Sequence, residues 1–301
     1  MRKKQLVATV VLSVFIAAFA HADDAWMQGQ QQWREARADA LAQPDGWLSL
    51  VGLHWLSPGR HAVGKAPGKD IVLSAGPEVL GDFELIEQDG VDLVRWYPPE
   101  DAKALRYNDT PVGSEPMQFG ADSSDQPGLI TWSGGSVQLI ERGEKLGLRV
   151  RDAQAPTRIN FQGLSWFDPD PHWQVTARFE AKPAGSTIPI ANVLGQLEDT
   201  PNPGRVVFEI DGTRYALEAL GDPAESLFLI VADRSNGKQT YGAGRFLYTD
   251  AVVGDEVQLD FNRMVNPPCA YNAYSTCPLP PPENRLNLAV QAGEKTYQGA
   301  H

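Results

Sequence analysis

The residues best suited to ligand chemistry lie in one segment, from Asp233 to Arg285. The segment is rich in phenol, amide, guanidinium and carboxylate groups, and its many prolines restrict the backbone. Binding groups concentrate on rigid irregular loops of this kind, where aromatic faces pack on sugar rings while Asn and Arg bond hydroxyl or carboxylate groups. The residues that we predict to bind a ligand are Tyr241, Arg245, Asp260, Asn262, Asn266, Tyr271, Asn284 and Arg285.

A purely structural role is the alternative interpretation of the same residues. Buried irregular loops need Asn, Asp and Arg side chains to satisfy their own backbone groups. On this interpretation, Arg245 or Arg263 pairs with Asp260 or Glu283 and fixes the loop to the strands. Both interpretations stay open at this point.

Three carboxylates, Asp233, Asp260 and Glu283, support a rival hypothesis of a hydrolase. Glycoside chemistry needs two carboxyl groups in different environments, roughly 5 to 9.5 Å apart. The sequence has no Gly-x-Ser-x-Gly, His-Glu-x-x-His or phosphate-binding loop motif, so no catalytic residue is assigned.

Cys269 and Cys277 are separated by seven residues within a Pro-rich loop. In an oxidising compartment a disulfide is the first expectation, and free thiols are the alternative. A thiolate metal pair is disfavoured because no further ligand follows at the usual spacing. His54 and His61 flank a turn, where exposed histidines are far commoner than ligands. We therefore predict a Cys269–Cys277 disulfide, with no metal and no cofactor.

The first 22 residues have the pattern of a secretory signal peptide. A basic start, Arg2 to Lys4, precedes an apolar run from Leu6 to Ala20, and Ala20-His21-Ala22 offers a cleavage site. An uncleaved anchor is the alternative, although the apolar run is short for a span. We expect a periplasmic or secreted protein with no stable membrane span after cleavage.

Composition and charge limit the partners. The chain has 301 residues, of which 42% are hydrophobic and 21% charged, so it can bury a sizeable core. Loss of the signal peptide would remove three of the 26 Lys and Arg and none of the 38 Asp and Glu, leaving a net charge of −15. Such a surface repels phosphate backbones, so we expect no nucleic-acid partner.

The pattern of apolar residues predicts a mostly β fold, a sandwich or distorted barrel, with one short N-terminal helix. The helix is expected over 24–42, within a segment 23–45, because apolar residues recur at helical spacing and Pro44 follows. Short strands then form two β-rich blocks, 46–155 and 156–301, either as two domains or around a shared core. Asp211-Gly212 is the strongest hairpin signal.

Several longer stretches carry a family resemblance; they are Gly46–Leu56, Thr240–Leu247, Asp260–Arg263 and Asn266–Leu286. The last is a distinctive pattern of Pro, Cys, Asn and Arg. With these stretches the chain resembles the bacterial family catalogued as domain of unknown function 1684, from about Trp33 to Tyr297. It departs from the expected pattern at Met264-Val265, where we expect Ala-Tyr. The resemblance implies a secreted or periplasmic protein and no particular activity.

Our leading functional prediction is a binding module for a small polar ligand or an envelope glycan. The motivation is the aromatic and amide-rich loop on a β scaffold. A carboxylate-dependent hydrolase and a structural or assembly protein of the envelope are the alternatives.

Overall fold

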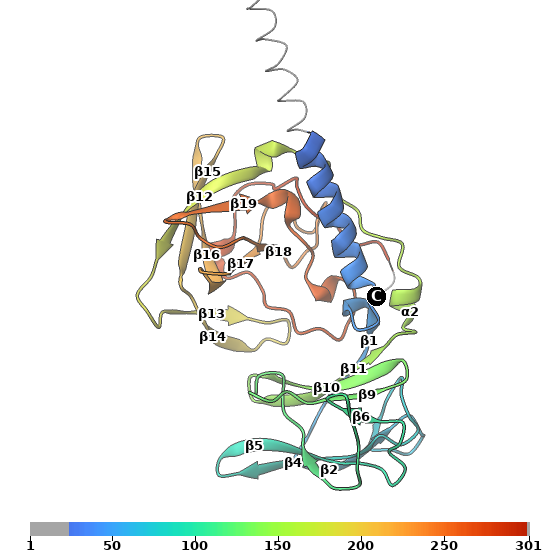
Figure 1. The fold of residues 1–301 in the computed structure, drawn as a ribbon. Helices are drawn as coiled ribbons and strands as arrows, with labels where there is room; N and C mark the ends of the chain where they lie inside the picture. The colour runs from blue at the N-terminus through green and yellow to red at the C-terminus, as the bar shows by residue number, and fades with distance from the viewer. Residues whose placement is uncertain (1–23, 300–301) are drawn as a thin grey trace, which may run out of the picture.

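The computed structural model describes residues 24–299 (Figure 1). The predicted signal peptide, residues 1–22, therefore lies outside the described residues. The predicted N-terminal helix is confirmed: residues 24–41 are helical, and a turn through Pro44 leads to the short 3-10 helix η1 (Trp47–Ser49). Among residues 24–299, no helix is both long and apolar enough to cross a membrane.

The first eleven strands form two sheets that face each other, which we call the first sandwich. One sheet has the strand order β1-β11-β10-β9-β6-β7 and the other has the order β3-β2-β4-β5-β8. The strands are β1 (Leu50–Trp55), β2 (Gly59–Gly64), β3 (Ile71–Val72), β4 (Gly81–Gln88), β5 (Val91–Tyr97), β6 (Arg106–Tyr107), β7 (Thr110–Pro111), β8 (Met117–Gln118), β9 (Leu129–Trp132), β10 (Gly135–Arg142) and β11 (Lys145–Asp152).

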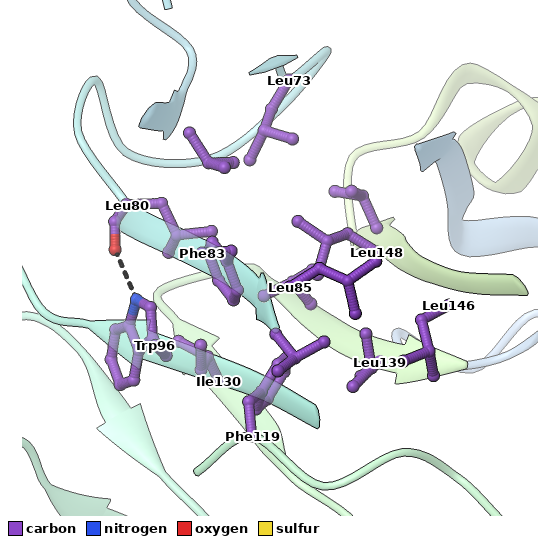
Figure 2. Packing of buried hydrophobic residues seen from close by; sticks show 14 of the residues in the cluster. Leu73, Leu80, Phe83, Leu85, Trp96, Phe119, Ile130, Leu139, Leu146 and Leu148 are labelled. Carbon is purple, nitrogen blue, oxygen red and sulfur yellow. Dashed lines mark hydrogen bonds between the residues drawn. The ribbon is translucent and has the colours of Figure 1, made fainter. Parts of the chain in front are cut away.

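Alternating apolar residues from both sheets fill the core of the first sandwich (Figure 2). Phe83 of β4 lies 5.5 Å from the ring of Phe119 and 6.2 Å from that of Trp96, centroid to centroid. The buried indole of Trp96 donates a hydrogen bond to the carbonyl of Leu80 at 3.0 Å, so its one polar atom is satisfied.

The later strands form a six-stranded sheet in the order β18-β17-β16-β15-β12-β19, which we call the second sheet, and the separate hairpin β13-β14. Asp211 and Gly212 join β15 to β16 with φ angles of 51° and 72°, which confirms the predicted hairpin turn. The strands are β12 (Gln174–Ala181), β13 (Thr187–Ala191), β14 (Leu197–Pro201), β15 (Gly204–Ile210), β16 (Thr213–Asp222), β17 (Ser226–Val231), β18 (Arg245–Tyr248) and β19 (Glu256–Asp260).

Short helical turns occupy the connections and the C-terminal third. They are α2 (Pro156–Ile159), η2 (Pro171–Trp173), η3 (Phe261–Arg263), η4 (Pro268–Ala270) and η5 (Pro282–Asn284). The predicted fold class, mostly β with sandwich or distorted barrel sheets and one N-terminal helix, is confirmed.

Strands β11 and β17 each contribute side chains to two different regions of the protein, one on each face of the strand. In β11, Leu148 and Val150 point into the core of the first sandwich, so Arg149 between them points to the opposite, outer face. In β17, Leu227 and Leu229 belong to the core of the second sheet, and Phe228 between them belongs to a different apolar cluster. Figure 1 shows the sheet of β10 and β11 lying between the rest of the first sandwich and the later strands.

The N-terminal helix packs against residues that come much later in the chain. Gln30 donates a hydrogen bond to the Asp260 carboxylate at 2.6 Å, and Arg34 donates to the carbonyl of Phe167 at 2.9 Å. The rings of Trp33 and Trp166 meet edge to face at 5.7 Å. These contacts place the end of the helix, including Arg37, beside the Pro- and Cys-rich loop.

We predict that Phe83→Ala lowers the free energy of unfolding by about 3–5 kcal/mol, because it leaves a cavity among closely packed rings. Val91→Ala, on an exposed side chain of the same sandwich, should change it by less than about 0.5 kcal/mol. Urea unfolding followed by tryptophan fluorescence measures both values. Equal effects from the two variants would contradict this assignment of the core.

Candidate functional site

Cys269 and Cys277 form a disulfide, with Cα atoms 6.2 Å apart. It closes residues 269–277 within a longer Pro-rich segment, 265–281, which we call the cysteine loop. Asn272 organises the loop, since its side-chain oxygen accepts hydrogen bonds from the Tyr274 amide at 2.9 Å and the Ser275 hydroxyl at 2.8 Å. Its amide nitrogen donates to the carbonyl of Trp47 at 3.0 Å. The loop is thereby fixed to the segment that follows the N-terminal helix.

The carboxylate of Glu294 is fully buried and joins three parts of the chain. It accepts hydrogen bonds from the Tyr271 hydroxyl at 2.6 Å, the Asn266 amide at 2.7 Å and the Arg37 Nε at 3.1 Å. Burial, together with the charge of Glu294, raises the pKa of Tyr271 well above its usual value. Burial opposes the charge on Arg37, but Glu294 and Tyr271 together outweigh burial, so the pKa of Arg37 is raised.

Arg245 and Asp233 form a second buried ion pair, at 3.0 Å, with no exposed side-chain surface on either residue. The guanidinium also donates to the carbonyls of Val290 at 2.9 Å, Glu294 at 3.2 Å and Ala292. Burial lowers the pKa of Arg245, and Asp233 partly offsets this effect. The structural interpretation named Arg245 or Arg263 as the arginine that pairs with Asp260 or Glu283. Arg245 is not that arginine, because its partner is Asp233, two residues after the end of β17.

Asn262 and Asn284 each bind both backbone groups of one residue on another segment. Asn262 accepts from the Asp170 amide and donates to the Asp170 carbonyl, both at 2.9 Å. Asn284 does the same with Glu218, at 2.6 and 2.9 Å. Each side-chain amide thus takes the place of a neighbouring strand residue.

Asp260 is also committed to the fold. Its carboxylate caps η3 by accepting the Asn262 amide at 3.1 Å, and it pairs with Arg263 at 3.4 Å. This second pairing is one that the structural interpretation predicted. Of the other predicted residues, Tyr241 donates to the Cys269 carbonyl at 3.3 Å and Arg285 is exposed.

The eight predicted ligand-binding residues therefore do not form one cluster. Asn266 and Tyr271 bind the buried carboxylate of Glu294, and Arg245 contacts the backbone carbonyl of the same residue. Asp260 and Asn262 contact each other elsewhere, and Asn284 lies at a third place, against Glu218. Asn266 is the one of the eight that also lines the cavity described next. A ligand-binding role stays a prediction for all eight.

A cavity of about 310 Å³, which we call the central cavity, lies between the first sandwich and the second sheet. Three separate regions of the chain form its walls: the end of the N-terminal helix with η1, the outer face of β10 and β11, and β17 and β18 with the cysteine loop. The lining residues are Arg37, Trp47, Arg142, Arg149, Phe228, Phe246, Tyr248, Val265, Asn266, Pro268, Ser275, Thr276, Cys277 and Pro278.

Aromatic rings form the apolar part of the cavity wall. Phe228 stacks on Tyr248 with ring centroids 4.9 Å apart and meets Phe246 edge to face at the same distance. Tyr248 is 56% exposed at the rim. Trp47 lies on another side, with its ring 5.8 Å from the Arg149 guanidinium carbon.

Two arginines from the first sandwich converge on the hydroxyl of Thr276 in the cysteine loop. Arg142 Nε donates to it at 2.9 Å and Arg149 Nη2 at 3.2 Å. Arg142 also forms an ion pair with Asp122 at 2.9 Å. Arg149 is only 4% exposed, and within residues 24–299 no carboxylate lies within 4.0 Å of it.

Electrostatics disfavour the charge on Arg149. Burial lowers its pKa to about 10, with further lowering by the charges of Arg142 and Arg151 and a small opposing effect of Asp122. Its buried Nε has no hydrogen-bond partner within the described residues. The central cavity thus contains a guanidinium group that the fold does not neutralise.

Sequence reasoning missed most of the cavity, including Arg142, Arg149, Trp47, Phe228 and Tyr248. The available signal was the alternation Leu148-Arg149-Val150-Arg151, which places two arginines on the outer face of a buried strand. A charged face of a strand is usually solvated, so this signal becomes meaningful only once another part of the chain is seen to cover it. Within the described residues, no group of three or more His, Cys, Asp or Glu is arranged to hold a metal.

Comparisons with known proteins agree with the resemblance noted in the sequence. The family described as "Protein of unknown function (DUF1684)" matches residues 159–295. One similar solved structure is the solution NMR structure of an uncharacterized protein from Haloarcula marismortui, with 34% sequence identity and a TM-score of 0.38. The match covers 46% of the present chain and 79% of the Haloarcula chain. No curated protein matches. The chain belongs to the family of domain of unknown function 1684.

The matched span, 159–295, holds the second sheet, the cysteine loop and Glu294. It does not include Arg37, Arg142 or Arg149. One wall of the central cavity therefore comes from the matched region, and the arginines come from outside it.

The two buried arginines should respond in opposite ways to replacement by Met. Arg245→Met should lower the free energy of unfolding by about 3–5 kcal/mol, because it leaves the Asp233 carboxylate buried and unpaired. Arg149→Met should leave it unchanged or raise it by about 1 kcal/mol, because it removes a buried charge that has no counter-ion. Urea unfolding of both variants gives the comparison. A loss for Arg149→Met as large as that for Arg245→Met would mean that Arg149 stabilises the fold.

Proposed function

We propose that this protein binds a small polar ligand in the central cavity. The observation that carries the proposal is the composition of the cavity wall. The rings of Phe228, Phe246 and Tyr248 and the hydrogen-bonding groups of Arg149, Thr276 and Asn266 line the same cavity. A volume of about 310 Å³ with convergent polar groups on an apolar wall is typical of small-molecule sites.

The geometry supports binding over hydrolysis. No Asp, Glu or His is among the described residues that line the cavity, so the wall lacks the paired carboxylates that the hydrolase hypothesis needs. Two of the three carboxylates considered for a hydrolase are in ion pairs, Asp233 with Arg245 and Asp260 with Arg263. The third, Glu283, is exposed on η5.

The proposal includes a periplasmic or extracellular location. It is supported by the signal-peptide pattern of residues 1–22 and by the Cys269–Cys277 disulfide, which persists in oxidising compartments. A small envelope glycan or a small polar molecule taken up from outside would be available there.

A thermal-shift panel of neutral sugars, amino acids and small organic acids tests the proposal, and calorimetry of each hit gives its Kd. Tyr248→Ala should weaken a hit by about tenfold, because it removes a ring from the rim, while leaving the melting temperature of the free protein nearly unchanged. Leu197→Ala, which removes a 70% exposed apolar side chain outside the cavity, is the control. The proposal fails if no member of the panel raises the melting temperature.

Replacing both cysteines, Cys269→Ser with Cys277→Ser, should lower the free energy of unfolding by about 2–3 kcal/mol. It should also weaken the same hit, because the cysteine loop provides Pro268, Ser275 and Thr276 to the cavity. Calorimetry at a temperature where the variant is fully folded separates the two effects. Unchanged affinity in the folded variant would show that the loop does not shape the site.

A further inference from the structure

We propose that the ligand of the central cavity is a ring-bearing monocarboxylate whose carboxylate group is held by Arg149. This inference rests on the proposed function, since it specifies the chemistry of the ligand at the same site.

The unneutralised guanidinium of Arg149 is the first observation. A buried charge without a partner is costly, and a protein that needed only to fill this position could use an apolar side chain. Arg149 instead keeps one hydrogen bond, to Thr276, and a buried Nε with no partner among the described residues. An anion in the cavity would supply the missing counter-charge.

The surrounding charges set the charge of that anion. Asp122 is engaged by Arg142, and the buried carboxylate of Glu294 by Arg37. Of the three arginines that line the cavity, two therefore have a carboxylate partner and Arg149 has none, so the local excess is one positive charge. A single carboxylate balances it, whereas a phosphate dianion would exceed it. The guanidinium fork also matches the planar geometry of a carboxylate.

The remaining walls describe the rest of the ligand. Phe228, Phe246 and Tyr248 offer aromatic surface to a ring. Asn266 is 1% exposed, and its side-chain oxygen is buried without a hydrogen-bond partner within the described residues, while its nitrogen donates to the Lys295 carbonyl at 2.8 Å. This oxygen is an acceptor for a ligand hydroxyl. A hydroxylated ring acid, either a uronic acid or a hydroxybenzoic acid, meets all three requirements.

Two matched pairs of probes test the inference by calorimetry on the purified protein. Glucuronate is compared with glucose, and 4-hydroxybenzoate with 4-hydroxybenzamide, so that each pair keeps the ring and changes the charge. We expect at least one acid to bind ten or more times more tightly than its neutral partner. Which pair responds distinguishes a sugar acid from an aromatic acid. Inorganic phosphate should bind more weakly than the acid that responds.

Variants connect the preference to one side chain. Arg149→Met should remove the tenfold preference for the acid, and Arg149→Lys should keep part of it, because an ammonium group retains the charge without the fork. Arg151→Met is the matched control, since Arg151 lies on the same face of β11, two residues further along, and does not line the cavity. It should keep the full preference.

The outcomes separate this inference from the proposed function. If the neutral partners bind as tightly as the acids and Arg149→Met changes nothing, the cavity binds a ligand but the assignment to a carboxylate is wrong. Tighter binding of phosphate than of either acid would also overturn it. If none of these four compounds binds while another member of the thermal-shift panel does, the inference is wrong and the proposed function stands. If no member of the panel binds, both fail.

Discussion

The buried carboxylate of Glu294 holds together the parts of the chain on which the cavity depends. Its three donors come from the N-terminal helix, from the start of the cysteine loop and from Tyr271 within that loop. Arg245 contacts the backbone of the same residue while pairing with Asp233. A carboxylate with no exposure to water must find all its partners inside the protein, so these segments can meet in few arrangements.

This constraint explains how a face of the first sandwich comes to be covered. Leu148 and Val150 need a core on one side of β11, and the cysteine loop and second sheet cover the other side. Arg149 is buried as a result of that second packing, not of its own strand. Arg142, at the end of β10, forms an ion pair with Asp122, so its charge is neutralised. Arg142 has a carboxylate partner and Arg149 has none because the packing places a carboxylate beside only one of them.

Local features were predictable from the sequence, and their partners were not. The turn at Asp211 and Gly212 requires two residues that tolerate positive φ, and the Asp-Gly pair between two apolar runs predicts it from the sequence alone. The N-terminal helix and the short strands follow from spacing in the same way. The pairing of Arg263 with Asp260 lies within one turn and was among the predicted alternatives, whereas the partner of Arg245 is Asp233, twelve residues earlier in the connection after β17. The central cavity lay beyond prediction because its walls come from positions as distant as Arg37 and Pro278, and only long-range packing brings them together.

The distance in sequence between the walls of the cavity has a consequence for how the chain matures. The arginines belong to the part synthesised first, and the loop that covers them is synthesised more than a hundred residues later. Arg149 loses its hydration shell only when that loop and the second sheet pack over β11, so its dehydration penalty falls on this packing step. A small anion present at that moment would lower the penalty, and its binding and the closure of the molecule would then be one linked equilibrium.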